Sequence, residues 1–337
     1  MLIDTTFRAF QRQFQNGLVE MLNPDEVGAF ILVLANGMQE AELHEALSPA
    51  LGNVFDAQRQ LYAHGELNAA PDDMAVFEAL NTSGIEHFGC WDLRQSELWL
   101  LAYNPMRALR PPRASKQPFT GLKRPFDDNA FHFDKPFLRP EIISETSFAG
   151  KTLRLMYHKF PFAPYHLLLL IEAAAHRPQY LDAESDAFFW QLTEKTAEQL
   201  PGIGIAYNSL GAGASINHLH AHSFLQQTAL AIEAPHWTHN GGSQRYPLPV
   251  ERYTTAAESS ERIAALHQEN QPFNLLYRPG QCYLVTRRPQ GDASLPEWLG
   301  VPAWYEVSGG FNLADRDRFQ QLTAAEIEAA LGLLAPG

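Results

Sequence analysis

The sequence has few of the features that mark secreted, membrane-spanning or nucleic-acid-binding chains. It contains only two cysteines in 337 residues. Cys90 and Cys282 lie far apart and in no CxxC spacing, so we expect two ordinary reduced thiols and no disulfide framework. No apolar run approaches the roughly 18 residues of a spanning helix, and the first residues lack the basic and apolar parts of a signal peptide. We therefore expect a cytoplasmic protein without a membrane partner.

Positive charge is also scarce, since the formal net charge is −13. A broadly basic surface dominates affinity for nucleic acids, so we expect no nucleic-acid partner. Between positions 101 and 126, however, the chain has no acidic residue and six basic ones, namely Arg107, Arg110, Arg113, Lys116, Lys123 and Arg124. A local cationic strip in an acidic protein favours a small phosphate-bearing ligand. The alternative is a solvated loop beside an acidic neighbour.

Hydrophobic periodicity divides the chain into three regions. Residues 1–100 are expected to be mostly helical, since Phe7, Phe10, Phe14 and Leu18 recur at spacings of three and four. Prolines then break regular structure and place a boundary near residue 100. Residues 101–230 and 231–337 are expected to form two α+β regions that share one core. Strands are predicted at 152–157, 166–171, 203–207, 216–225, 273–277 and 281–287, with a helix at 182–200 crossing an antiparallel sheet.

One segment places three histidines at alternate positions, His218, His220 and His222. On a strand this period of two puts all three imidazoles on one face. Gly211 and Gly213, in the loop before them, allow backbone N–H groups to approach an oxyanion closely. A neutral imidazole can attack phosphorus, and its neighbours can donate to phosphoryl oxygens or to the leaving group. The alternatives are a transition-metal site or a purely structural role.

The stretch Asn208-Ser-Leu-Gly, followed by Ile216-Asn-His-Leu-His, resembles the GDP-hexose phosphorylases of the histidine-triad (HIT-like) superfamily. Similar stretches, such as Arg124-Pro-Phe-Asp and Pro302-Ala-Trp-Tyr-Glu, extend the resemblance over roughly residues 105–337. The resemblance implies a HIT-like α+β fold with a nucleotide-binding region at 101–230. It also implies transfer of a nucleoside monophosphate from a nucleoside-diphosphate sugar, through a nucleotidylated histidine, to inorganic phosphate. We expect no cofactor and no catalytic metal bound by the three histidines, because metal ligation would occupy the nucleophile.

The resemblance also assigns roles to individual residues. The middle histidine of the motif, His220, is the expected nucleophile, and His218 is expected to orient the motif. The residues expected to bind the nucleotide and its phosphates are Asn208, Gly211, Gly213, Ser215, His166, Lys123 and Arg124.

Two positions depart from the family pattern. His222 stands where the phosphorylases usually carry Gln, and His158 stands where the superfamily commonly has Asn. Because an imidazole can supply a proton and an amide cannot titrate, water could replace phosphate as acceptor. Two other functions therefore remain open: a dinucleoside polyphosphate phosphorylase or hydrolase, and a non-catalytic nucleotide or metal binder.

Overall fold

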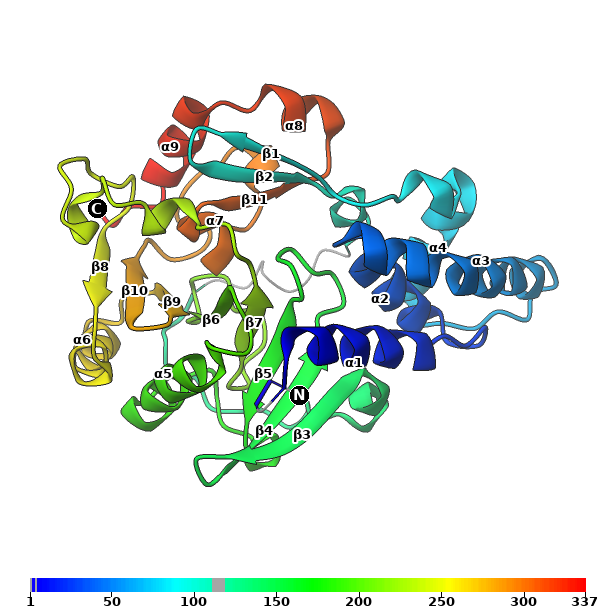
Figure 1. Ribbon diagram of the computed structural model, residues 1–337, viewed down its shortest axis with the longest axis horizontal. Coiled ribbons are helices and arrows are strands. Elements are labelled where there is room, and N and C mark those ends of the chain that lie inside the picture. Colours follow the sequence, from blue (N-terminus) through cyan, green and yellow to red (C-terminus); the bar gives the residue numbers. More distant parts are fainter. Residues whose placement is uncertain (1, 4, 111–118) are drawn as a thin grey trace.

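The computed structural model describes residues 2–3, 5–110 and 119–337 (Figure 1). Arg113 and Lys116 of the cationic strip lie outside the described residues. The chain begins with four helices, which lie together on one side of the molecule: α1 (Phe7–Glu20), α2 (Val27–Gly37), α3 (Ala41–Ala63) and α4 (Pro71–Ser83). The predicted apolar stripe buries Phe10, Phe14 and Leu18 on α1. The predicted helical character of the N-terminal region is thus confirmed.

An eight-stranded antiparallel sheet forms the centre of the fold. Its order is β3-β4-β5-β7-β6-β9-β10-β8. Helix α5 (Ala183–Thr196), predicted over 182–200, follows β5 and is capped by Asp182, and α6 (Ala256–Glu269) precedes β9. The predicted α+β class with an antiparallel sheet and crossing helices is therefore confirmed. The strands are β3 (Ile142–Phe148), β4 (Lys151–Tyr157), β5 (Leu167–Ile171), β6 (Ile203–Asn208), β7 (Ala221–Leu225), β8 (Val250–Tyr253), β9 (Phe273–Arg278) and β10 (Gln281–Thr286).

The predicted strand over 216–225 is wrong in its first half, because β7 begins only at Ala221. The backbone groups just before it bond outside the sheet. Leu219 N donates to Arg177 O, and His220 N donates to the side chain of Gln179. Of the three motif histidines, only His222 therefore lies in a strand.

A second, three-stranded sheet joins residues 92–103 to the C-terminal part of the chain. It consists of β1 (Asp92–Ser96), β2 (Trp99–Tyr103) and β11 (Gly310–Leu313), and β11 pairs with β2 in parallel. Three helices pack near it: α7 (Trp304–Ser308), α8 (Arg316–Gln321) and α9 (Ala324–Gly332). Strand β2 spans the boundary predicted near residue 100. Among the described residues, no helix has the length and apolar character needed to cross a bilayer.

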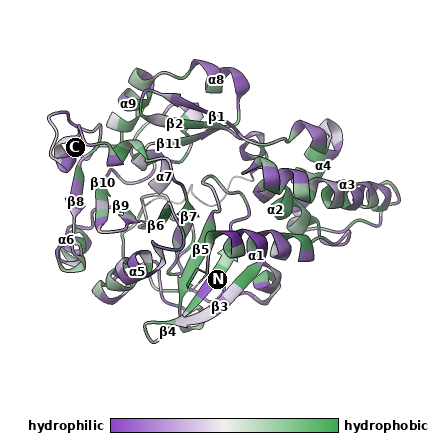
Figure 2. Ribbon diagram, viewed as in Figure 1, coloured by the Kyte–Doolittle hydropathy of each residue, from purple (hydrophilic) through white to green (hydrophobic). Residues whose placement is uncertain are grey.

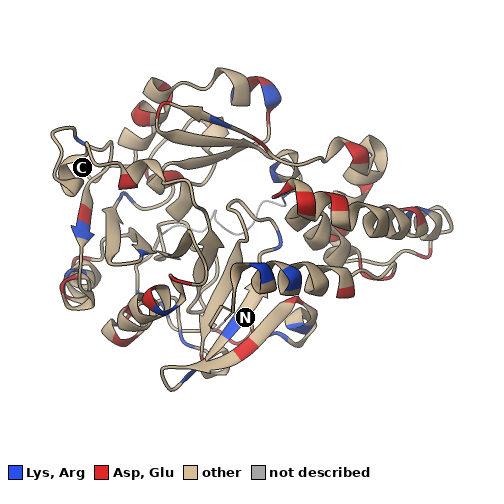
Figure 3. Ribbon diagram, in the orientation of Figure 1, with Lys and Arg blue, Asp and Glu red and all other residues tan. Residues whose placement is uncertain are grey.

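The two faces of the large sheet are buried differently. Alternate strand residues such as Leu155, Leu169 and Ile205 join the N-terminal helices, α5 and α6 in the largest apolar cluster. On the opposite face, Phe224 and Leu276 pack with residues of α7 and α9, whereas Leu168 and Leu170 form a separate cluster with Phe133. Figure 2 shows β5 as strongly hydrophobic, and Figure 3 shows few charged positions on the central strands. The candidate site lies on this second face.

Candidate active site

A cavity of about 1310 Å³ opens on the second face of the sheet. Five residues predicted from the sequence line it: Asn208, Gly213, Ser215, His220 and His222. His166 is fully buried and contacts His222 rather than forming part of the cavity wall. The other predicted residues, His218, Gly211, Lys123 and Arg124, do not line the cavity. The structure thus brings together the core of the predicted site and leaves these four outside it.

The ring of His220 is held in one tautomer. Its Nδ1 lies 2.7 Å from the backbone oxygen of His218. A carbonyl oxygen can only accept, so Nδ1 carries the proton and Nε2 keeps its lone pair. The Gln179 side chain fixes the backbone of His220 on both sides, accepting from its N–H and donating to its oxygen. Burial lowers the pKa of His220 to about 4, so near neutral pH this imidazole is an uncharged nucleophile.

His218 has both ring nitrogens engaged. Its Nδ1 accepts from Phe133 N at 3.2 Å, and its Nε2 lies 3.0 Å from Ala173 O. Burial lowers the pKa of His218 to about 4 as well. The ring therefore bridges two chain segments, while the carbonyl of the same residue orients His220. This geometry is consistent with the supporting role expected for His218.

His222 belongs to a chain of hydrogen bonds. The Oδ1 of Asn208 accepts from Trp304 N at 2.8 Å and from Asn274 Nδ2 at 2.6 Å. This orientation leaves Asn208 Nδ2 to face His222 Nε2 at 3.3 Å. His222 Nε2 then accepts from Asn208, and its Nδ1 lies 2.9 Å from His166 Nε2, while His166 Nδ1 accepts from Phe162 N at 3.4 Å. The sequence did not assign Trp304 or Asn274 to the site, although Trp304 lies in a stretch that resembles the family.

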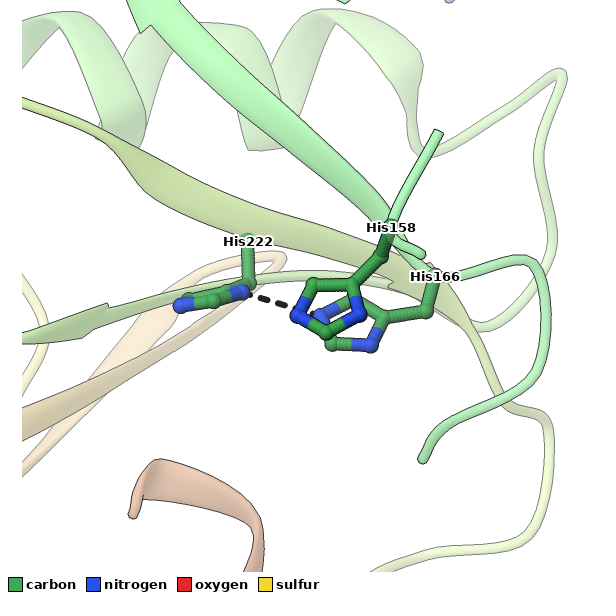
Figure 4. Close-up of side chains that lie close together, drawn as sticks. All are labelled: His158, His166 and His222. Carbon is green, nitrogen blue, oxygen red and sulfur yellow. Dashed lines mark hydrogen bonds between the residues drawn. The ribbon is translucent and has the colours of Figure 1, made fainter. Parts of the chain in front are cut away.

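His158, His166 and His222 form a compact group that could hold a metal ion. Their rings lie close together (Figure 4), and one nitrogen of each is within 4.8 Å of the others. The surrounding charge opposes a cation. Burial, reinforced by the charge of Arg107, lowers the pKa of His166 well below its usual value. Burial and, among the nearby charges, Arg110 do the same to the pKa of His222. This environment favours an anion over a divalent cation.

A second group, Asp128, His132 and His176, lies beside His218 and could also hold a metal ion. His176 Nδ1 is 2.8 Å from Asp128, and its Nε2 is 3.4 Å from Asp134. These carboxylates suit a cation better than the surroundings of His222 do. None of the three residues lines the cavity. The absence of a catalytic metal on the histidine motif stays a prediction.

Arginines from two distant segments supply positive charge to the cavity. Arg107 and Arg110 come from the cationic strip, and Arg287 follows β10. Arg107 Nη1 is buried, and no hydrogen-bond partner for it occurs among the described residues. Arg287 Nη1 donates to Pro302 O at 2.6 Å. The sequence analysis did not assign Arg287 to the site, because its burial depends on tertiary packing and not on a local pattern. Lys123, by contrast, is exposed, with its Nζ 5.8 Å from the ring centre of Tyr180.

The glycine loop packs against the start of α7. Gly213 has φ +100°, and a Cβ there would lie 2.8 Å from Ala303 Cβ. Ala303 is the N-cap residue of α7, whose first residue, Trp304, bonds to Asn208. Glycine is thus required for the backbone conformation and for the close approach. The loop conformation and the orientation of Asn208 depend on the same contact.

Aromatic rings lead away from the nucleophile along one cavity wall. The ring centre of Phe133 is 4.9 Å from that of His220, and Phe131 lies 5.8 Å beyond Phe133. Phe137 follows at 6.2 Å from Phe131. Phe131 and Phe137 are 42% and 68% exposed. Large apolar side chains that face solvent together commonly mark binding surfaces. The sequence analysis did not identify this wall.

Part of the chain is similar in sequence to known proteins. Residues 98–224 match the family described as GDPGP1-like, N-terminal domain. GDP-L-galactose phosphorylase 2 of Arabidopsis thaliana is 29% identical over 196 residues, which cover 50% of this chain and 44% of that protein. This chain thus matches less than half the length of that relative.

Solved structures of the yeast Ap4A phosphorylase Apa2 are also similar. The complex with Ap4A has a TM-score of 0.48 and 14% identity, covering 80% of this chain and 99% of that one. The complex with AMP has a TM-score of 0.49, with coverage of 77% and 93%. The match of the family and of the plant enzyme confirms the resemblance predicted from the sequence, and residues 98–224 are the part of this chain that is similar to a GDPGP1-like N-terminal domain.

Proposed function

We propose that this protein transfers a nucleoside monophosphate from a nucleoside-diphosphate sugar to inorganic phosphate, through a covalent intermediate on His220. The observation that carries the proposal is the tautomer of His220. Its Nδ1 is tied to His218 O, so the Nε2 lone pair is available in a cavity lined by arginines. The low pKa of about 4 keeps this imidazole neutral at physiological pH.

In the first step, His220 Nε2 attacks the α-phosphorus of the substrate. The new N–P bond forms as the bond from the α-phosphorus to the bridging oxygen breaks, and the sugar phosphate departs with the electron pair. The imidazole ring becomes cationic, and the Nδ1–H bond to His218 O stabilises that charge. In the second step, an oxygen of inorganic phosphate attacks the same phosphorus. His220 leaves as a neutral ring, and the product is a nucleoside diphosphate.

Arg107 and Arg110 would stabilise the charge that develops on the phosphoryl oxygens. The buried Arg107 Nη1 has a hydrogen to donate and no partner among the described residues. Preorganised donors in a water-poor site act strongly on developing charge. We also assign Asn208, Gly213 and Ser215 to phosphate binding, because they lie on the cavity wall with His220. We do not extend this role to Lys123 and Arg124, which lie outside the wall.

The aromatic wall of Phe131, Phe133 and Phe137 would hold the nucleoside. Base–aromatic stacking contributes about 1–3 kcal/mol per base in proteins that bind single-stranded nucleic acids. The wall begins beside His220 and continues outward. The name of the plant relative, a GDP-L-galactose phosphorylase, supports a GDP-hexose as the donor. Water is the alternative acceptor, because His222 stands where the GDP-hexose phosphorylases usually carry Gln, and an imidazole can supply a proton.

The test follows release of sugar phosphate from GDP-hexoses in the presence of phosphate. His220→Ala should lower kcat by at least about 10³-fold, as removal of a covalent nucleophile does in other enzymes. The stopped wild-type enzyme should carry a nucleotide on a histidine, detectable by intact mass. His267→Ala is the control, because His267 also has a pKa lowered by burial, to about 4, yet lies on α6 outside the cavity. Turnover by His220→Ala near the wild-type rate would exclude the covalent mechanism.

A further inference from the structure

The loop that connects β4 to β5 carries a histidine at each end. His158 follows β4 directly, and His166 directly precedes β5. The two rings stack with centres 4.2 Å apart, and His166 bonds to His222 (Figure 4). The position of this loop therefore decides where the His166 nitrogen meets the catalytic motif.

Two buried amides, one on α2 and one in the turn between α2 and α3, hold both ends of the loop. Asn36 Nδ2, on α2, donates to His158 O at 3.0 Å and to Leu32 O at 2.9 Å. Gln39 Oε1 accepts from Tyr165 N at 2.5 Å, and Gln39 Nε2 donates to Asn36 Oδ1 at 2.8 Å. Asn36 is fully buried and Gln39 is 7% exposed. The two amides thus form one hydrogen-bonded unit.

Three further contacts attach the same loop to the N-terminal helices. Tyr157 OH, at the end of β4, donates to Phe14 O of α1 at 2.6 Å. Lys159 Nζ lies 2.5 Å from an Asp73 oxygen of α4. Tyr165 OH donates to Glu40 at 2.6 Å and accepts from Gln11 at 2.8 Å.

Tyr165 also needs an external restraint, because its φ is +50°. This left-handed conformation is uncommon for a bulky residue and persists only where neighbouring groups impose it. The bond from Tyr165 N to Gln39 supplies such a restraint immediately before His166.

We infer that the N-terminal helices are part of the catalytic apparatus: Asn36 and Gln39 are positioning residues that hold His158 and His166 against His222. The inference rests on the proposed function, because His166 bonds to His222, which lines the cavity together with the proposed nucleophile His220. The match to the family spans residues 98–224 of this chain, and both amides lie outside that segment. A buried amide that loses its partner has a desolvation cost, so the two residues act as a pair.

The experiment compares Asn36→Leu and Gln39→Met with Gln58→Met. Gln58 is equally buried in α3, and neither its nitrogen nor its oxygen has a hydrogen-bond partner among the described residues. Each variant is examined by the imidazole ¹⁵N NMR signals of His166 and His222 and by steady-state kinetics. The NMR signals report the tautomers without requiring turnover.

Asn36→Leu and Gln39→Met should shift the His166 and His222 signals and lower kcat on the order of ten-fold, with a smaller change in KM. Misplacement by about 1 Å can cost up to 10²-fold in rate. Gln58→Met should alter neither. If the two variants do not fold, Tyr165→Phe, which removes only the bonds to Glu40 and Gln11, should shift the same signals.

A folded Asn36→Leu or Gln39→Met protein with unchanged signals and kcat would overturn the inference. Where neither of these variants folds, unchanged signals in Tyr165→Phe would overturn it. An inactive wild-type protein whose imidazole signals still depend on Asn36 would instead contradict the proposed function.

Discussion

The chemistry of each histidine in the site depends on a neighbour whose hydrogen-bonding role cannot change. His218 O can only accept a hydrogen bond, so the proton of the neutral His220 ring lies on Nδ1. Asn208 is oriented by Trp304 N and Asn274, so its amide nitrogen faces His222. The three motif residues therefore differ in role although they share a spacing: His220 presents a free nitrogen to the cavity, His222 connects to His166, and His218 is engaged on both sides.

His222→Gln tests the position that departs from the family pattern. A glutamine can still form hydrogen bonds but cannot titrate. Burial and nearby positive charge lower the pKa of His222, so the neutral ring predominates at pH 7 and any change belongs to the acidic side of the profile. A bound anionic phosphate raises this pKa. We expect His222→Gln to flatten the acidic limb of kcat and to favour phosphate over water as acceptor.

The measurement is phosphorolysis and hydrolysis of one GDP-hexose by both proteins between pH 5 and 9. His267→Gln, outside the cavity, is the control for loss of one partly buried histidine. Identical pH profiles and product ratios for wild type and His222→Gln would show that titration of His222 does not contribute to the reaction.

At the scale of elements, the site lies where three segments meet on one face of the sheet. The ends of β6 and β7 supply Asn208 and His222, the loop between them supplies Gly213, and α7 fixes Asn208 through Trp304 N. The N-terminal helices hold the β4–β5 loop on the other side. Asn208 and His166 are thus oriented by elements distant in sequence.

Gly213→Ala should disturb the contact between the glycine loop and α7. The added Cβ would lie 2.9 Å from Ala303 Cα, and the φ of +100° disfavours any side chain. Such backbone strain costs about 1–3 kcal/mol. We expect a lower melting temperature and a KM for the nucleotide sugar raised several-fold, because displacement of α7 frees Asn208.

Gly280→Ala provides the matched control. Gly280 has φ +76° in the β9–β10 turn, and a Cβ there would meet no atom within 4 Å. This variant should lose stability through its backbone conformation alone and keep the wild-type KM. An equal KM in both variants would mean that the loop–α7 contact does not position the phosphate site.

At the scale of the whole molecule, the site is a cluster of buried neutral histidines, and this links folding to pH. Burial lowers the pKa of His218 and His220 to about 4, against about 6.5 in an unfolded chain. Between these values the unfolded state binds more protons, so stability is complete above about pH 6.5 and falls as the pH decreases toward 4. At pH 5 each of these histidines lowers the free energy of unfolding by about 2 kcal/mol.

We therefore expect the urea midpoint to fall between pH 7.5 and pH 5, a range in which most carboxylates stay ionised. His220→Gln removes one of the proton-binding groups and should show a smaller decrease than wild type. An identical decrease in both proteins would show that His220 is not held neutral by the fold.

The sequence by itself determined the α+β class, the helical N-terminal region and the strands β4, β5, β9 and β10. These features depend on local periodicity and on turn and capping residues, which are readable over a few positions. The HxHxH spacing and the glycine loop identified the motif, because a few residues of the required types stand close together in the chain.

Only the tertiary structure decided which groups surround that motif. Arg287, Trp304 and Asn274 reach the site from the last quarter of the chain, and Asn36 and Gln39 act from the first. Their side chains become neighbours of the histidines through sheet pairing and core packing, which no local pattern encodes. The start of β7 at Ala221 has the same cause, because Gln179 and Arg177 take up the backbone groups before it. The motif was local, but its protonation states and charge depend on contacts between distant segments.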